Sequence, residues 1–87
     1  MFVIMVYDVN EKRVGKALKI SRKYLNWVQN SVFEGEISKA KLTKLKVEMK
    51  ELINRKEDSI IFYELRSTRY TSRDIIGQEK GGDDNFL

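Results

Sequence analysis

The chain has 87 residues and a net charge of +4, from 17 Lys and Arg against 13 Asp and Glu. This length fits one domain with a modest core, so we expect oligomerisation to add stability. The sequence contains no Cys and no His, which excludes disulfides, thiolate or imidazole metal ligands, and catalysis by either side chain. A bound metal must then be a hard cation held by oxygen atoms, such as Mg²⁺ or Mn²⁺.

The first predicted element is a strand over residues 2–8. Six consecutive apolar or aromatic residues precede Asp8, which is typical of a strand buried on both faces. The run is too short for a signal peptide or a membrane span, so we expect a cytoplasmic protein without a membrane partner. Asp8 falls at the strand's C-terminal end, where such folds often present reactive groups. An ordinary turn role for Asp8 is the alternative.

The second predicted element is a helix over residues 11–24. Asn10 suits its N-cap, and apolar residues recur at helical spacing along one face. The remaining arc of the helix is basic, which makes it a candidate contact for nucleic-acid phosphates, with an ordinary solvated lysine face as the alternative. Its six cations are Lys12, Arg13, Lys16, Lys19, Arg22 and Lys23.

The rest of the chain predicts two more strands in a hairpin, a second helix and a last strand. Residues 26–37 are rich in β-branched and aromatic residues without strict alternation, which favours two short strands in a hairpin. A helix over residues 39–54 and a strand over residues 59–65 follow. The order is α+β, a ferredoxin-like βαββαβ fold with an antiparallel sheet against two helices. We predict that this domain spans residues 1–78 and that residues 79–87 form a flexible tail.

Common signatures of catalytic and RNA-binding domains are absent from the sequence. The strand over residues 59–65 lacks the glycine-containing aromatic motif with which RNA-recognition modules stack bases. There is no glycine-rich phosphate loop, paired acid motif or nucleophile–base arrangement. Aromatic side chains on the first and last strands indicate that a second copy of the chain covers the open sheet face.

Three stretches together resemble the CRISPR-associated protein 2 family. They are the strand end Val6-Tyr7-Asp8-Val9, the pair Lys12-Arg13 on the basic helix, and the block Val28-Gln29-Asn30-Ser31-Val32-Phe33-Glu34-Gly35. The final strand and Ile76-Gly77 are also similar to the family, so the resemblance covers nearly the whole chain.

The resemblance implies a CRISPR adaptation protein that forms a homodimer, in which the C-terminal strand of each chain is exchanged to complete the partner's sheet. In the family, the aspartate that matches Asp8 lies near the dimer axis. It is assigned as a magnesium ligand of a metal-dependent endonuclease that acts on single-stranded RNA or double-stranded DNA. The family also bridges two dimers of the CRISPR integrase in the spacer-integration complex, a role that does not require the acidic residue.

We therefore predict that Asp8 is both the catalytic residue and the metal ligand, with Mg²⁺ or Mn²⁺ shared between the two copies in a dimer. Arg13 is the best candidate for binding nucleic-acid phosphate, followed by Lys12 and Lys16. Tyr7 is a further candidate for nucleic-acid contact, although strand alternation points it to the face opposite Asp8, where packing is the alternative role.

Two other functions fit the same residues. A non-catalytic scaffold would hold duplex DNA between integrase dimers on its basic surface, with Asp8 as a turn or interface residue. A toxin-type endoribonuclease would share the fold. Arg22 could contact nucleic acid or be an ordinary surface residue. Arg66 and Arg69 could contact nucleic acid or the partner subunit, and the sequence does not decide.

Overall fold

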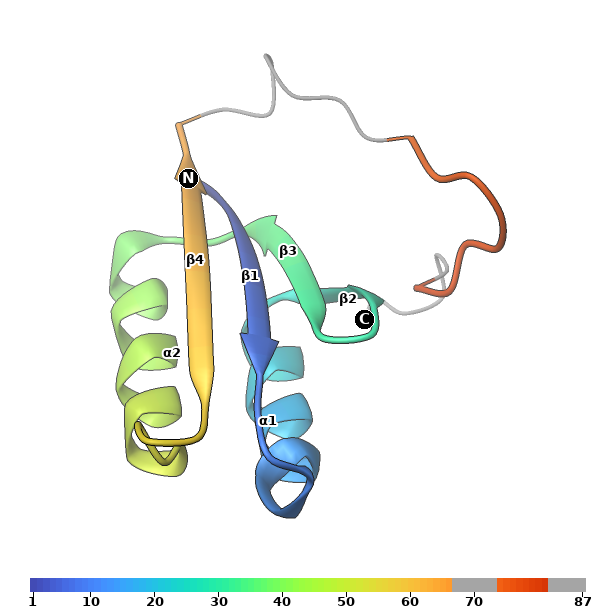
Figure 1. Ribbon diagram of the computed structural model, residues 1–87. Coiled ribbons are helices and arrows are strands. Elements are labelled where there is room, and N and C mark those ends of the chain that lie inside the picture. Colours follow the sequence, from blue (N-terminus) through green and yellow to red (C-terminus); the bar gives the residue numbers. More distant parts are fainter. Residues whose placement is uncertain (67–73, 82–87) are drawn as a thin grey trace.

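The computed structural model describes residues 1–66 and 74–81. Its elements follow the predicted β-α-β-β-α-β order (Figure 1). They are β1 (Phe2–Asp8), α1 (Glu11–Tyr24), β2 (Asn26–Gln29), β3 (Val32–Glu36), α2 (Lys39–Leu52) and β4 (Ser59–Leu65).

The four strands form one antiparallel sheet in the order β2-β3-β1-β4. β1 is central because it pairs with β3 on one side and with β4 on the other. Both helices lie on the same side of this sheet, and the opposite face is uncovered in the single chain (Figure 1). The ferredoxin-like prediction is therefore confirmed for the chain itself.

The hairpin of β2 and β3 explains why residues 26–37 do not alternate strictly. The register shifts between Trp27 and Gln29, and Asn30 adopts a positive φ of 43° in the turn. Asn tolerates this left-handed conformation better than most residues because its short polar side chain can bond locally. The prediction of two short strands is confirmed.

The core lies between the sheet and the two helices. It is built from ten buried side chains, namely Val3, Met5, Tyr7, Ala17, Leu25, Phe33, Ile37, Leu42, Leu45 and Met49. Only alternate residues of β1 belong to it, while Phe2, Ile4 and Val6 on the open face are half-buried. The prediction of a strand buried on both faces is therefore wrong for the single chain, because the helices cover one side only.

The second helix ends two residues earlier than predicted. Ile53 has extended backbone angles and closes α2 with a hydrogen bond from its N–H to the carbonyl of Met49. The next N–H, that of Asn54, donates to the side chain of Asp58 at 2.9 Å instead of continuing the helix. A carboxylate in the following loop thus fixes where α2 stops.

The C-terminal segment is described as far as Gly81. Residues 74–81 loop away from the sheet and return to β2 at their end, where a Cβ on Gly81 would lie 2.4 Å from the carbonyl oxygen of Trp27 (Figure 1). Glycine at this position allows that close approach. Residues 82–87, which make up most of the predicted tail, and Arg69 fall outside the described residues, so the domain boundary at residue 78 stays a prediction.

Candidate functional site

Asp8 is the last residue of β1, and its side chain is exposed. In the antiparallel ladder it lies opposite Ser59, the first residue of β4. Residues paired in this way point to the same face, so both belong to the uncovered side of the sheet. The carboxylate is therefore held at one end of a rigid strand and is accessible to a ligand.

Along β1 and β4 the open face that leads to Asp8 is apolar, whereas β3 contributes Glu34 and Glu36 opposite Ile4 and Phe2. Val6 lies opposite Ile61, and Ile4 lies opposite Tyr63. The β4 members of these pairs remain 49% and 53% exposed in the single chain, although both are large apolar or aromatic residues. An exposed contiguous apolar surface is typical of a protein interface.

A single chain provides too few ligands for a metal ion at Asp8. Across residues 1–66 and 74–81, no group of three acidic side chains is arranged to hold a cation. The Asp8 carboxylate has the hard oxygen atoms that Mg²⁺ and Mn²⁺ prefer, but it is one ligand of the several that an octahedral ion needs. The residues fit such an ion only if a second copy brings its own Asp8 to the same site.

Tyr7 points away from Asp8, to the helix side of the sheet. It is 5% exposed, and its ring stacks on Phe33 with centroids 6.0 Å apart and planes inclined by 21°. Burial raises the pKa of the Tyr7 phenol, and the positive charge of Arg22 offsets part of this rise. These contacts account for Tyr7 by packing, while its predicted contact with nucleic acid stays a prediction.

The three predicted phosphate-binding residues of α1 separate into two groups. Lys12 and Lys16 are exposed on the outer side of the helix. Arg13 is only 20% exposed, because its guanidinium forms ion pairs with Asp58 and Glu57 in the loop before β4. Arg13 therefore has protein partners that its place in the basic helix did not predict.

Asp58 is the centre of this arrangement. Its side chain is fully buried, and it accepts hydrogen bonds from Arg13 Nε at 2.7 Å and Arg13 Nη2 at 3.2 Å. The backbone N–H groups of Asn10 and Asn54 donate to its two oxygens at 2.8 Å and 2.9 Å. These donors, Arg13 above all, hold the pKa of Asp58 well below its usual value, and the same bonds raise that of Arg13.

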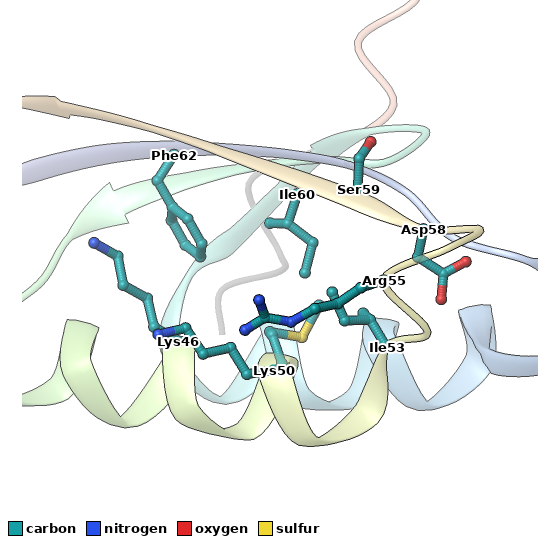
Figure 2. Close-up of a pocket in the computed structure, with 9 residues that line it drawn as sticks. Lys46, Lys50, Ile53, Arg55, Asp58, Ser59, Ile60 and Phe62 are labelled. Atoms are coloured by element: carbon teal, nitrogen blue, oxygen red, sulfur yellow. The ribbon is translucent and has the colours of Figure 1, made fainter.

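A pocket of about 510 Å³ opens between α2 and β4 (Figure 2). Its floor is apolar, and the cations Lys46, Lys50 and Arg55 line it. Lys46 is engaged, since its ammonium pairs with Glu64 at 2.9 Å and lies over the ring of Phe62. The pocket is on the helix side of β4 and so is separate from the open face that carries Asp8.

Comparison with known proteins agrees with the fold and with the sequence motifs. The family model described as CRISPR associated protein Cas2 matches residues 1–73. The chain belongs to the Cas2 family. It is 60% identical over 87 residues to "CRISPR-associated endoribonuclease Cas2" of Thermotoga maritima, covering 100% of this chain and 99% of that protein. It is 54% identical to the protein of the same name in Dictyoglomus turgidum, over the full length of both chains.

Solved Cas2 structures have the same architecture. A crystal structure of Cas2 superposes with a TM-score of 0.86 at 40% identity, covering 94% of this chain and 92% of that one. The Streptococcus pyogenes Cas2 structure at pH 6.5 superposes with a TM-score of 0.75 at 33% identity, covering 86% and 99%. Among the described residues, no helix is long and apolar enough to cross a membrane.

Proposed function

We propose that the protein is a metal-dependent endonuclease of CRISPR adaptation that acts as a homodimer, with Asp8 of both chains at the catalytic site. The observation that carries this proposal is the exposed carboxylate of Asp8 at the end of an uncovered apolar sheet face. Family membership adds support, because Cas2 relatives of the same length are named endoribonucleases.

The dimer forms through the open faces of two sheets. Covering Ile61 and Tyr63 removes apolar surface from water, which favours association by about 25 cal/mol per Å² buried. A two-fold axis near the end of β1 brings the two copies of Asp8 together. The C-terminal strand of each chain is exchanged and completes the partner's sheet.

The two carboxylates would hold one Mg²⁺ or Mn²⁺ ion. Such an ion would supply positive charge to the phosphodiester group and lower the pKa of bound water. The contribution of the chain is to fix both carboxylates on the ends of central strands, where the sheet limits their movement. Lys12 and Lys16 hold the nucleic-acid backbone by charge alone.

The substrate is single-stranded RNA or double-stranded DNA. To test the proposal, labelled RNA and duplex DNA are incubated with wild type and Asp8→Asn, in Mg²⁺ and in EDTA. Glu51→Gln on α2 is the matched control, because it also converts an exposed carboxylate to an amide. We expect cleavage that requires Mg²⁺, persists in the control and disappears in Asp8→Asn. Equal cleavage by wild type and Asp8→Asn would contradict the proposal.

A second candidate function is a non-catalytic scaffold that holds DNA between integrase dimers. The exposed Lys12 and Lys16 favour it, because they can bind phosphates without any metal. If wild type binds duplex DNA and integrase but cleaves nothing in Mg²⁺ or Mn²⁺, this function replaces the first. The toxin-type endoribonuclease is not proposed as a third candidate, because the chain belongs to the Cas2 family and no contact among the described residues favours it.

A further inference from the structure

One buried carboxylate connects three parts of the chain near Asp8. Asp58 binds the backbone N–H of Asn10 after β1, the guanidinium of Arg13 in α1 and the backbone N–H of Asn54 after α2. With four hydrogen bonds on its two oxygens, it cannot reorient without breaking several of them. The Asp58 carboxylate therefore fixes the positions of these three segments relative to one another.

The same contacts hold the two backbone segments next to Asp8, one along the chain and one across the sheet. Along the chain, Asn10 follows two residues later and its N–H is held by Asp58 Oδ1 at 2.8 Å. Across the sheet, Asp8 lies opposite Ser59, the residue directly after Asp58. A movement of Asp58 would thus shift the strand end that carries Asp8 from two directions.

Figure 2 shows the carboxylate of Asp58 pointing away from the pocket beside α2. On that outer side Glu57 binds the same two residues, because its Oε1 accepts hydrogen bonds from Arg13 Nη2 at 2.8 Å and from Asn10 Nδ2 at 3.2 Å. Two of the three guanidinium nitrogens of Arg13 are therefore engaged with acidic side chains. This use of the side chain competes with the phosphate contact that the sequence predicts.

Stability alone does not account well for such a pair. Removing the Asp58 carboxylate fully and the Arg13 guanidinium partly from water is costly, and replacing a buried ion pair with apolar residues often leaves stability unchanged or raises it. A bidentate arginine–carboxylate pair is, however, a strong constraint on geometry. Metal-binding carboxylates depend on such constraints, and loss of an outer partner typically lowers metal affinity 10- to 100-fold.

We propose that Arg13 and Asp58 are positioning residues for Asp8, which hold the end of β1 in the geometry that a shared divalent cation requires. This inference rests on the proposed function, since it needs Asp8 to be the metal ligand. Arg13 is then assigned to the ordering of the site and not to the binding of substrate phosphate.

The test is a titration of the dimer with Mn²⁺, followed by electron paramagnetic resonance, without nucleic acid. The proteins are wild type, Asp8→Asn, Arg13→Gln, Arg13→Lys and Asp58→Asn. Lys46→Gln is the matched control, because it removes an ion pair of similar length far from β1's end. All titrations are carried out well below each protein's melting temperature, with dimerisation checked by light scattering.

We expect Asp8→Asn to abolish the site, and Arg13→Gln and Asp58→Asn to weaken Mn²⁺ binding by about tenfold or more. Arg13→Lys should restore part of the affinity, because it keeps the charge but not the planar fork. Lys46→Gln should bind as wild type does, even if it melts at a lower temperature. If Asp58→Asn does not fold, the two Arg13 variants still decide the question.

Binding of a short RNA in EDTA separates positioning from phosphate contact. The proposal expects the RNA affinity of Arg13→Gln to equal that of wild type. Lowered RNA affinity with unchanged Mn²⁺ affinity would overturn it and return Arg13 to the nucleic-acid interface. Wild-type Mn²⁺ affinity in Arg13→Gln, and in Asp58→Asn where that variant folds, would overturn positioning while the Asp8 site stands. If wild type binds no more Mn²⁺ than Asp8→Asn, the proposed function fails and positioning fails with it.

Discussion

The rings of Tyr7 and Phe33 stack on the helix side of the sheet with their centroids 6.0 Å apart, opposite the side that carries the carboxylate of Asp8. Two neighbouring residues of one strand thus serve different purposes, because successive side chains point to opposite faces. Tyr7 anchors β1 in the core, and Asp8 is presented at the surface.

Replacement of Tyr7 separates packing from substrate contact. We expect Tyr7→Phe to retain stability, nucleic-acid binding and cleavage, because the stacked ring remains. Tyr7→Ala should lower the free energy of unfolding by about 3 kcal/mol, as is usual when a buried aromatic ring is removed. Urea unfolding and RNA binding are measured on both variants. A loss of RNA affinity in Tyr7→Phe with unchanged stability would show that the hydroxyl contacts substrate.

The ion pair of Asp58 predicts how stability depends on pH. Because Arg13 lowers the pKa of Asp58 in the folded protein, the pair stabilises the fold above the unfolded-state value of about 3.9. This contribution is lost as the pH falls through the lower folded-state pKa. The melting temperature of wild type should therefore exceed that of Asp58→Asn by a constant amount from about pH 7 to pH 5 and by less below about pH 4. A difference that stays constant to pH 2 would contradict this.

The open sheet face predicts where a charge will break the dimer. Ile61 on β4 and Val47 on α2 are exposed to almost the same extent, 49% and 47%. We expect Ile61→Asp to give monomers, because the new carboxylate would be buried at the interface, and Val47→Asp to leave the dimer intact. Light scattering during size-exclusion chromatography measures both. If Ile61→Asp still forms dimers, the dimer interface does not lie on the open sheet face.

The exposed lysines of α1 predict a salt-dependent contact with nucleic acid. Lys12→Gln and Lys16→Gln should each reduce the slope of log affinity against log salt by about one for each phosphate contact removed. Lys44→Gln on α2 is the control, since it is exposed but belongs to the other helix. Binding to a fluorescent duplex is measured between low and moderate salt. Equal effects of all three changes would assign the interface to both helices.

Local patterns were sufficient to predict the fold. Apolar runs bounded by polar residues located β1 and β4, and Asn10 marked the start of α1, where its side chain accepts the N–H of Lys12 at 2.9 Å. The same patterns could not distinguish a core from an interface. The run of β1 presents apolar or aromatic side chains on both faces, but in the single chain only the face with Val3, Met5 and Tyr7 is buried.

The partners of Arg13 could not be predicted in this way. Arg13 and Asp58 are 45 residues apart, and their contact depends on how the loop before β4 folds against the start of α1. In the sequence, Asp58 is one polar residue of a turn and Arg13 one cation among six. Nothing in local periodicity distinguishes a partly buried arginine from its exposed neighbours, so both roles required the tertiary structure.

The central claim is that two copies of Asp8 share one divalent cation across the dimer. The most direct measurement is the number of Mn²⁺ ions bound per dimer, for wild type and for Asp8→Asn, under conditions in which both are dimeric. We predict one Asp8-dependent ion for every two chains and none in the variant. One such ion per chain, or the same number in both proteins, would contradict a shared site.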